Sequence, residues 1–157
     1  MRFTSVVDIR DLKKTWSNFE KRTKYAIRIC NQKVYITDAI AKFNYFHRLS
    51  RPDRKISFAF IQKTYLDRLP NARIYATDTA MAMFSWTKNT AYYLLAGRDV
   101  SISDNSPSKI LWQAMIDFNK MEIKKLDLCG FNKPNIILFK RGFGGKKVKQ
   151  KKPCLCY

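Results

Sequence analysis

A lysine directly before a glycine-rich bend is the feature of this sequence that most suggests chemistry. Lys140 follows the apolar residues 136–139 and precedes Arg141, Gly142 and Gly144 in the segment LFKRGFGG. We interpret residues 135–140 as a strand, and the glycines after it allow a backbone to pass close to a ligand. A cation fixed there could neutralise a phosphate or the charge on a reacting carbonyl. We therefore assign Lys140 to catalysis and the other three residues to substrate binding; a surface lysine before a hairpin is the alternative.

Three further positions have polar side chains at suggestive spacings. Lys24 and Arg28 are four residues apart, so on a helix they present two donors to one phosphate, although an ordinary solvated helix face explains them equally well. Tyr92 and Tyr93 lie on opposite faces of one strand, and we choose Tyr93 as a candidate general acid, with core packing as the alternative. Asp127 alternates with two leucines and is a candidate base or orienting group.

Residue types for nucleophilic catalysis and metal binding are scarce. His47 is the single histidine and lies among aromatic residues, so we expect it to pack in the core, which disfavours a Ser-His-Asp or Cys-His site. Cys30 and Cys129 fall in apolar stretches and are expected in the core. Cys154 and Cys156 form a CxC without a second pair, so we predict no metal site.

Positive charge dominates the composition. Thirty-one Lys and Arg against twelve Asp and Glu leave a net charge of +19, spread over the whole chain. Such a field attracts an anionic donor or acceptor, such as coenzyme A, tRNA or a nucleotide-linked precursor, or the face of an anionic membrane. No apolar run approaches the roughly 18 residues of a membrane span, and nothing resembles a signal peptide, so we expect a cytoplasmic protein.

The elements that must position these residues can be predicted from periodicity and from helix-start signals. We expect strands at residues 3–9, 33–37, 72–78, 80–86, 90–97, 124–130 and 135–140. We expect helices at residues 11–30, 38–49 and 57–68, and a fourth that begins at residue 106. Asp11 and Ser106 are the predicted N-caps of the first and last helices. Short connections within residues 72–97 predict an antiparallel meander.

This order predicts a mixed α+β (α/β) layer: one mostly antiparallel central sheet flanked by helices. A chain of 157 residues is the size of one domain. We assign residues 1–150 to that domain and residues 151–157 to a short C-terminal tail.

Three stretches, taken together and in this order, resemble the FemAB-type aminoacyl and acyl transferases of the GNAT-like acyltransferase superfamily. They are FEKRTKYAIRIC (19–30), SPSKILWQAMIDFNKMEIKKLDLCG (106–130) and LFKRGFGGKKV (138–148). The resemblance covers nearly all of the chain, and the third stretch is its most specific part. It implies a GNAT-like fold, an acyl or aminoacyl donor, and a Lys140 that faces the substrate cleft. Better-known members join two such domains, and this chain is long enough for one.

The donor-binding pattern departs from ordinary GNAT enzymes, which hold the pyrophosphate of coenzyme A on a loop like [RQ]-x-x-G-x-[GA]. The corresponding stretch, AGRDVSISDNSPSKI, contains Arg98 but no G-x-G. Arg98 and the helix start at Ser106, where backbone N–H groups could receive an anion, are therefore our candidates for donor binding.

Three hypotheses follow from these residues. The first is a single-domain transferase that moves an acyl or aminoacyl group, from acyl-CoA or aminoacyl-tRNA, onto an amine of a cell-wall or cell-surface precursor. The second is a non-catalytic, basic nucleic-acid-binding module, and the third is a degenerate scaffold domain. Motif order favours the first, because charge alone would not produce it.

Overall fold

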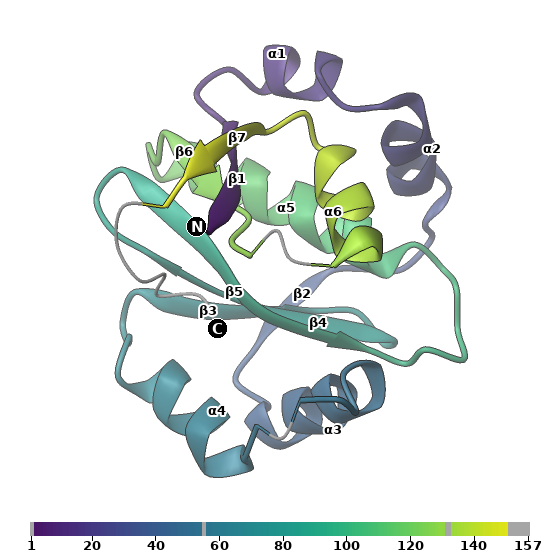
Figure 1. The fold of residues 1–157 in the computed structure, drawn as a ribbon, viewed down its shortest axis with the longest axis vertical. Coiled ribbons are helices and arrows are strands. Elements are labelled where there is room, and N and C mark those ends of the chain that lie inside the picture. Colours follow the sequence, from purple (N-terminus) through teal and green to yellow (C-terminus); the bar gives the residue numbers. More distant parts are fainter. Residues whose placement is uncertain (1, 55, 131–132, 151–157) are drawn as a thin grey trace.

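The computed structural model of the protein describes residues 2–54, 56–130 and 133–150 (Figure 1). Its strands are β1 (Phe3–Asp8), β2 (Tyr35–Thr37), β3 (Ala72–Ala76), β4 (Ala80–Trp86), β5 (Thr90–Arg98), β6 (Lys125–Asp127) and β7 (Lys146–Lys149). Its helices are α1 (Leu12–Ser17), α2 (Lys21–Ile29), α3 (Ile40–Ser50), α4 (Phe58–Leu66), α5 (Ser106–Lys120) and α6 (Pro134–Arg141). None of the helices in these described ranges is long and apolar enough to cross a membrane.

All seven strands form one sheet in the order β2-β3-β4-β5-β6-β1-β7. Neighbouring strands are antiparallel except β5 and β6, which are parallel. The predicted meander of β3, β4 and β5 is therefore confirmed, and so is the mostly antiparallel central sheet of a mixed α+β fold. A parallel pair needs a crossover connection, and the long helix α5 provides it between β5 and β6.

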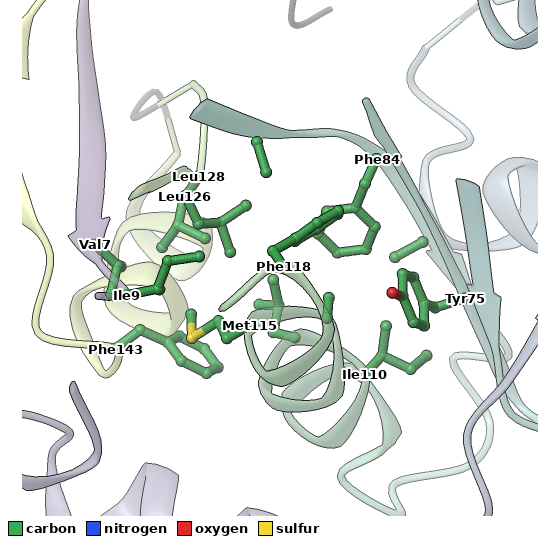
Figure 2. Packing of buried hydrophobic residues seen from close by; sticks show 14 of the residues in the cluster. Val7, Ile9, Tyr75, Phe84, Ile110, Met115, Phe118, Leu126, Leu128 and Phe143 are labelled. Carbon is green, nitrogen blue, oxygen red and sulfur yellow. The ribbon is translucent and has the colours of Figure 1, made fainter. Parts of the chain in front are cut away.

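Helices cover both faces of the sheet, which is why most residues of the central strands β4 and β5 are buried or half-buried. Figure 1 shows α3 and α4 on one face, with α5 and α6 on the other. Around α5 the core includes Ile110, Met115 and Phe118, packed against Val7 and Phe84 of the sheet (Figure 2). On the opposite face a second cluster of buried side chains joins α3 and α4 to β3, β4 and β5.

The parallel joint between β5 and β6 is short. It pairs Thr90–Tyr92 with Lys125–Asp127, after which β6 ends while β5 continues to Arg98. A bulge adds to the divergence: Phe84 of β4 faces Tyr93 and Met83 faces Leu95, so one residue of β5 is left without a partner on β4. Bulges bend and twist a strand. Among the described residues, the far half of β5 therefore has no strand on the side where β6 would lie.

The predicted strand at residues 135–140 is wrong: this segment is helix α6. A short apolar run fits a strand or a buried helix equally well, and Pro134 at the helix start was the stronger guide. Phe139 and Phe143 are four residues apart and their rings meet at 5.4 Å, as helical spacing allows. The closing strand is instead β7, which pairs with β1 along the sheet edge.

The predicted single helix at residues 11–30 is also wrong, because the chain breaks into α1 and α2. Asp11 caps α1 as expected, accepting hydrogen bonds from the N–H groups of Lys13 and Lys14. At the break Glu20 is extended (φ −63°, ψ 152°), and its N–H donates to the Gly142 carbonyl at 2.9 Å. The break therefore joins this end of the chain to the turn after α6.

Candidate active site

A cavity of about 850 Å³ opens where β5 and β6 part. The cavity follows β5 from Tyr93 to Arg98. Consecutive residues of a strand point to opposite faces of the sheet, so a cavity lined by all of them wraps around the unpaired edge of β5. The loop and first turn of α5 form one wall, α6 forms another, and the end of α3 with the following turn closes the third side. The short parallel joint thus leaves room for this cavity beside the second half of β5.

Lys140 lies in the wall of this cavity, in the last turn of α6, and not at the end of a strand as predicted. Its side chain is 6% exposed. The ammonium Nζ donates to the carbonyls of Cys129 and Gly130, the latter at 2.6 Å, and lies 5.8 Å from the centre of the Tyr93 ring. Hydrogen bonds from a charged donor are among the strongest in proteins. They hold this cation in one place on the cavity wall.

The backbone that receives Lys140 has an unusual conformation. Cys129 has a φ of 52°, in the left-handed region that residues other than glycine seldom adopt. This turn directs two successive carbonyls toward one ammonium. Strained backbone of this kind gathers at functional sites, where the surrounding structure must maintain it.

Asp127 maintains that turn. Its Oδ1 accepts hydrogen bonds from the Cys129 N–H at 2.8 Å and from the hydroxyl of Thr4 on β1. Asp127 does not line the cavity; it holds the loop whose carbonyls hold Lys140. Asp127 thus lies one layer behind the cavity wall, and its role as a base or orienting group stays a prediction.

Tyr93 lies beside Lys140 and lines the cavity, whereas Tyr92 packs against the cluster on the opposite face. The Tyr93 ring also packs 5.4 Å from the ring of Phe84. Burial raises the pKa of Tyr93 well above its usual value of 10, so the phenol stays protonated at neutral pH. Such a group can donate a proton or a hydrogen bond, but it cannot serve as a base.

The start of α5 brings Asp104 into the cavity wall, whereas Ser106 does not line the cavity. Ser106 is not the N-cap of α5: Asn105 is, with a φ of 63°, and Ser106 is the first helical residue. Its hydroxyl is completely buried and bonded to the hydroxyls of Thr77 and Thr79. The Ser106 N–H donates to the Asp104 carboxylate at 3.0 Å, so an anion of the chain itself already occupies this helix end.

Charged residues of both signs line the cavity, with positive charge in excess. Five are basic and two are acidic: Arg51, Arg54, Arg98, Lys133, Lys140, Asp53 and Asp104. Asp53 pairs with Lys133 at 2.5 Å and with Arg51 at 3.5 Å. The exposed Arg98 directs its guanidinium to the Ile102 carbonyl at 3.4 Å. This wall suits a ligand with at least one anionic group.

The other predicted substrate-binding residues lie away from the cavity. Lys24 and Arg28 are on α2, where Lys24 donates to the Ser17 carbonyl at 3.3 Å and Arg28 lies over the Trp16 ring at 5.3 Å. Arg141 is exposed and does not line the cavity either. Their role in substrate binding stays a prediction.

Gly142 and Gly144 serve close packing in this structure. A Cβ at Gly142 would lie 2.1 Å from the Thr23 hydroxyl oxygen of α2. Gly144 has a φ of 66°, and a Cβ there would lie 2.4 Å from the Asn18 carbonyl oxygen. Both glycines let the turn after α6 rest against the break between α1 and α2.

His47 is buried, as expected, and its ring stacks on Phe43 at 6.2 Å. Its Nδ1 lies 3.0 Å from the Ala96 carbonyl. Since a carbonyl only accepts, Nδ1 carries the hydrogen and Nε2 has the lone pair, for which the described residues offer no partner. Within those same residues no group of three or more His, Cys, Asp or Glu could hold a metal ion.

Sequence reasoning missed the backbone carbonyls of residues 129–130 and the carboxylate of Asp104. The carbonyls come from the chain end of β6 and give no sequence signal of their own. Asp104 stands two residues before Ser106, where an acid at a helix start suggests capping. Its position on the cavity wall follows only from the tertiary fold.

No family model matches the sequence, and no curated protein matches it. Solved structures share its fold. FemX superposes with a TM-score of 0.78 at 12% identity over 94% of this chain and 60% of FemX. The C-terminal domain of a predicted lysylphosphatidylglycerol synthetase from Agrobacterium fabrum gives 0.65 at 12% identity, over 93% and 57%. A functionally unknown protein from Staphylococcus epidermidis gives 0.58 at 10% identity, over 94% and 57%.

The chain therefore has the FemX-like, GNAT-like fold that its three motifs predict, and it spans about 60% of the length of these structures. At such low identity the likeness establishes the fold alone.

Proposed function

We propose that this domain is an N-acyltransferase that moves an acyl or aminoacyl group, from acyl-CoA or aminoacyl-tRNA, onto an amine of a cell-wall or cell-surface precursor. One observation carries the proposal: the Lys140 ammonium is fixed by the carbonyls of residues 129–130 in the wall of the cavity where β5 and β6 part.

The chemistry asks little of the protein. The amine nitrogen bonds to the acyl carbon, the bond from that carbon to the carrier oxygen or sulfur breaks, and the amine gives up a proton. Negative charge develops on the carbonyl oxygen, and a preorganised cation stabilises it without reorganising. The same charge disfavours a second cation nearby, so it lowers the pKa of an incoming amine and favours its nucleophilic form. Lys140 supports both steps without forming a covalent intermediate.

Tyr93 is suited to the leaving group. Its phenol lines the cavity beside Lys140 and stays protonated, because burial raises its pKa. It can therefore donate a hydrogen bond to the departing oxygen or sulfur and can pass its proton to a departing alkoxide, after which the proton released by the amine restores the phenol. Asp127 acts through the loop of residues 129–130 as a positioning residue for Lys140.

The start of helix α5 helps to choose between the two classes of donor. In the usual GNAT arrangement that helix end binds the pyrophosphate of coenzyme A, and here the Asp104 carboxylate accepts its N–H bond. This favours an aminoacyl-tRNA donor over acyl-CoA. One structural neighbour is named for lysylphosphatidylglycerol synthesis, which also supports an aminoacyl donor.

The test is Lys140→Met with Lys149→Met as its control, since Lys149 is an exposed lysine of β7 that does not line the cavity. Both variants are assayed with a panel of aminoacyl-tRNA and acyl-CoA donors and with amine acceptors. We expect Lys140→Met to lower kcat/KM by about 100-fold or more, the typical effect of removing one oxyanion donor. Near-UV circular dichroism establishes that the variant is folded. Turnover by folded Lys140→Met within threefold of the wild type would refute the proposal.

The second candidate, a non-catalytic nucleic-acid-binding module, rests on the net charge of +19. It predicts binding to unrelated RNA that weakens steeply with salt. That result, together with no turnover of any donor in the panel, would favour this second function over transfer.

A further inference from the structure

Asp104 is held rigidly in the wall of the cavity, at the end away from Lys140. Its Oδ2 accepts a hydrogen bond from the Thr79 hydroxyl at 2.6 Å, and its Oδ1 accepts one from the Ser106 N–H at 3.0 Å. Burial alone would raise the pKa of Asp104, but these hydrogen bonds lower it below its usual value. The carboxylate is therefore ionised at neutral pH and fixed in position.

This anion differs from the other acid of the cavity. Asp53 is neutralised by Lys133 and Arg51. For Asp104 the described residues provide only neutral donors, and the neighbouring Arg98 directs its guanidinium to a backbone carbonyl instead. A carboxylate oxygen has two lone pairs, so each oxygen of Asp104 can accept a further bond. A fixed anion in a cavity wall is the natural counterpart of an N–H-bearing cation.

Strand geometry sets the distance between the two charged groups. Lys140 lies beside Tyr93 of β5. Asp104 is hydrogen-bonded to Thr79, which lies next to the pair formed by Ala80 and Arg98, so Asp104 lies near Arg98 at the far end of β5. Tyr93 and Arg98 are five residues apart on β5, and a strand rises about 3.3 Å per residue. The ammonium of Lys140 and the carboxylate of Asp104 are therefore separated by on the order of 15 Å.

We propose that Asp104 binds a cationic group, an ammonium or a guanidinium, of an elongated acceptor substrate whose reacting amine lies near Lys140. An extended peptide of about four to five residues spans that separation. Assigning the cation to the acceptor rests on the proposed function, because the α-amino group of an aminoacyl donor lies too close to the reacting carbonyl to reach Asp104.

The probes are three pentapeptide amides, Gly-Gly-Gly-Gly-X, in which X is arginine, lysine or citrulline. Citrulline keeps the shape of arginine without its charge. Binding to the full chain is measured by isothermal titration calorimetry for the wild type and for Asp104→Asn, with Asp99→Asn as the control. Asp99 carries similar hydrogen bonds, from the Ser101 N–H and hydroxyl, but does not line the cavity.

We expect the wild type and Asp99→Asn to bind the arginine or the lysine peptide at least about tenfold more tightly than the citrulline peptide, as a charged hydrogen bond predicts. Asp104→Asn should bind the cationic and the neutral peptides equally. Thr79→Val keeps the charge of Asp104 but removes the hydroxyl that holds its carboxylate, so this variant should lose part of the preference for the cationic peptides. It is the alternative test if Asp104→Asn does not fold. No measurable binding, no preference in the wild type, or an undiminished preference in Asp104→Asn or Thr79→Val would overturn the inference.

Acylation of the same peptides, followed by mass spectrometry, separates this inference from the proposed function. Turnover without charge preference contradicts the role of Asp104 alone. Charge preference without turnover of any donor contradicts the proposed transferase and leaves the cation site supported.

Discussion

Gly97 is the point at which helix α3 rests on the sheet, and we expect Gly97→Ala to be strongly destabilising. A Cβ at this position would lie 2.3 Å from the His47 nitrogen and 2.4 Å from the Phe46 carbonyl carbon. The first distance is about 1 Å short of the 3.4 Å at which ordinary contacts begin. Both obstacles are backbone atoms, so neither can rotate away, and the whole helix must shift.

That shift would strain the cluster that α3 forms with α4 and the sheet, in which Phe43 and Phe46 are buried. Overpacking of a core typically costs about 1–3 kcal/mol, and we place Gly97→Ala at the upper end because only backbone can yield. For a domain of this size, about 3 kcal/mol corresponds to a fall in Tm of roughly 6–12 °C. Urea unfolding followed by circular dichroism measures the free energy of unfolding directly.

Gly145→Ala is the matched comparison. There the nearest obstacle is the Ser5 hydroxyl at 2.3 Å, and the nearest backbone atom is 3.2 Å away. A hydroxyl can rotate, so we expect a loss of about 1 kcal/mol or less. A Gly97→Ala variant as stable as Gly145→Ala, or within about 0.5 kcal/mol of the wild type, would show that α3 is not seated on β5 as described.

Two further predictions concern the core. Burial lowers the pKa of His47, so at mildly acidic pH the unfolded chain binds a proton at this residue more readily than the folded chain. The stability that neutral, buried His47 contributes is complete above about pH 6.5 and is lost as the pH falls through the native pKa. The slope of this loss approaches ~1.4 kcal/mol per pH unit. Urea titrations between pH 7.5 and 5 should show this loss in the wild type and not in His47→Gln; parallel curves would contradict it. Phe143 is 1% exposed and its ring packs 5.2 Å from Phe19, so Phe143→Ala should cost about 3–5 kcal/mol, whereas Phe58→Ala, at 42% exposure, should stay within about 0.5 kcal/mol. Equal losses for the two alanine variants, measured by urea unfolding, would contradict the packing of the turn after α6 against Phe19.

Local signals explain which elements could be predicted from the sequence. Asp11 hydrogen-bonds the first turn of α1, and the β-rich runs between residues 72 and 97 form a meander because each strand pairs with its sequence neighbour. Helix α6 could not be separated from a strand by its short apolar run. Tertiary contacts of the helix itself, such as the hydrogen bonds from Lys140 to the carbonyls of residues 129–130, are not visible in that run.

The candidate site was predictable only in part for the same reason. Lys140 stood out because a cation borders glycines in a specific motif, and the structure places it on the cavity wall beside Tyr93. Nothing in the sequence shows that backbone carbonyls from the end of β6 hold it. Lys24 and Arg28 illustrate the opposite limit: their spacing predicts a shared helix face, but not what that face meets.

The short joint between β5 and β6 also separates two parts of the sheet that can fold at different times. On one side, β2 to β5 come from a continuous stretch and pair with strands near in sequence. On the other, β1 lies between β6 and β7, so Phe3 must find Lys149 across almost the whole chain. Contacts of long sequence separation form slowly, because the loop entropy must be lost before they do. During synthesis the meander can fold early, whereas the wall that carries Lys140 can form only after α6 has emerged. The cavity is thus the boundary between an early half and a late half of the domain.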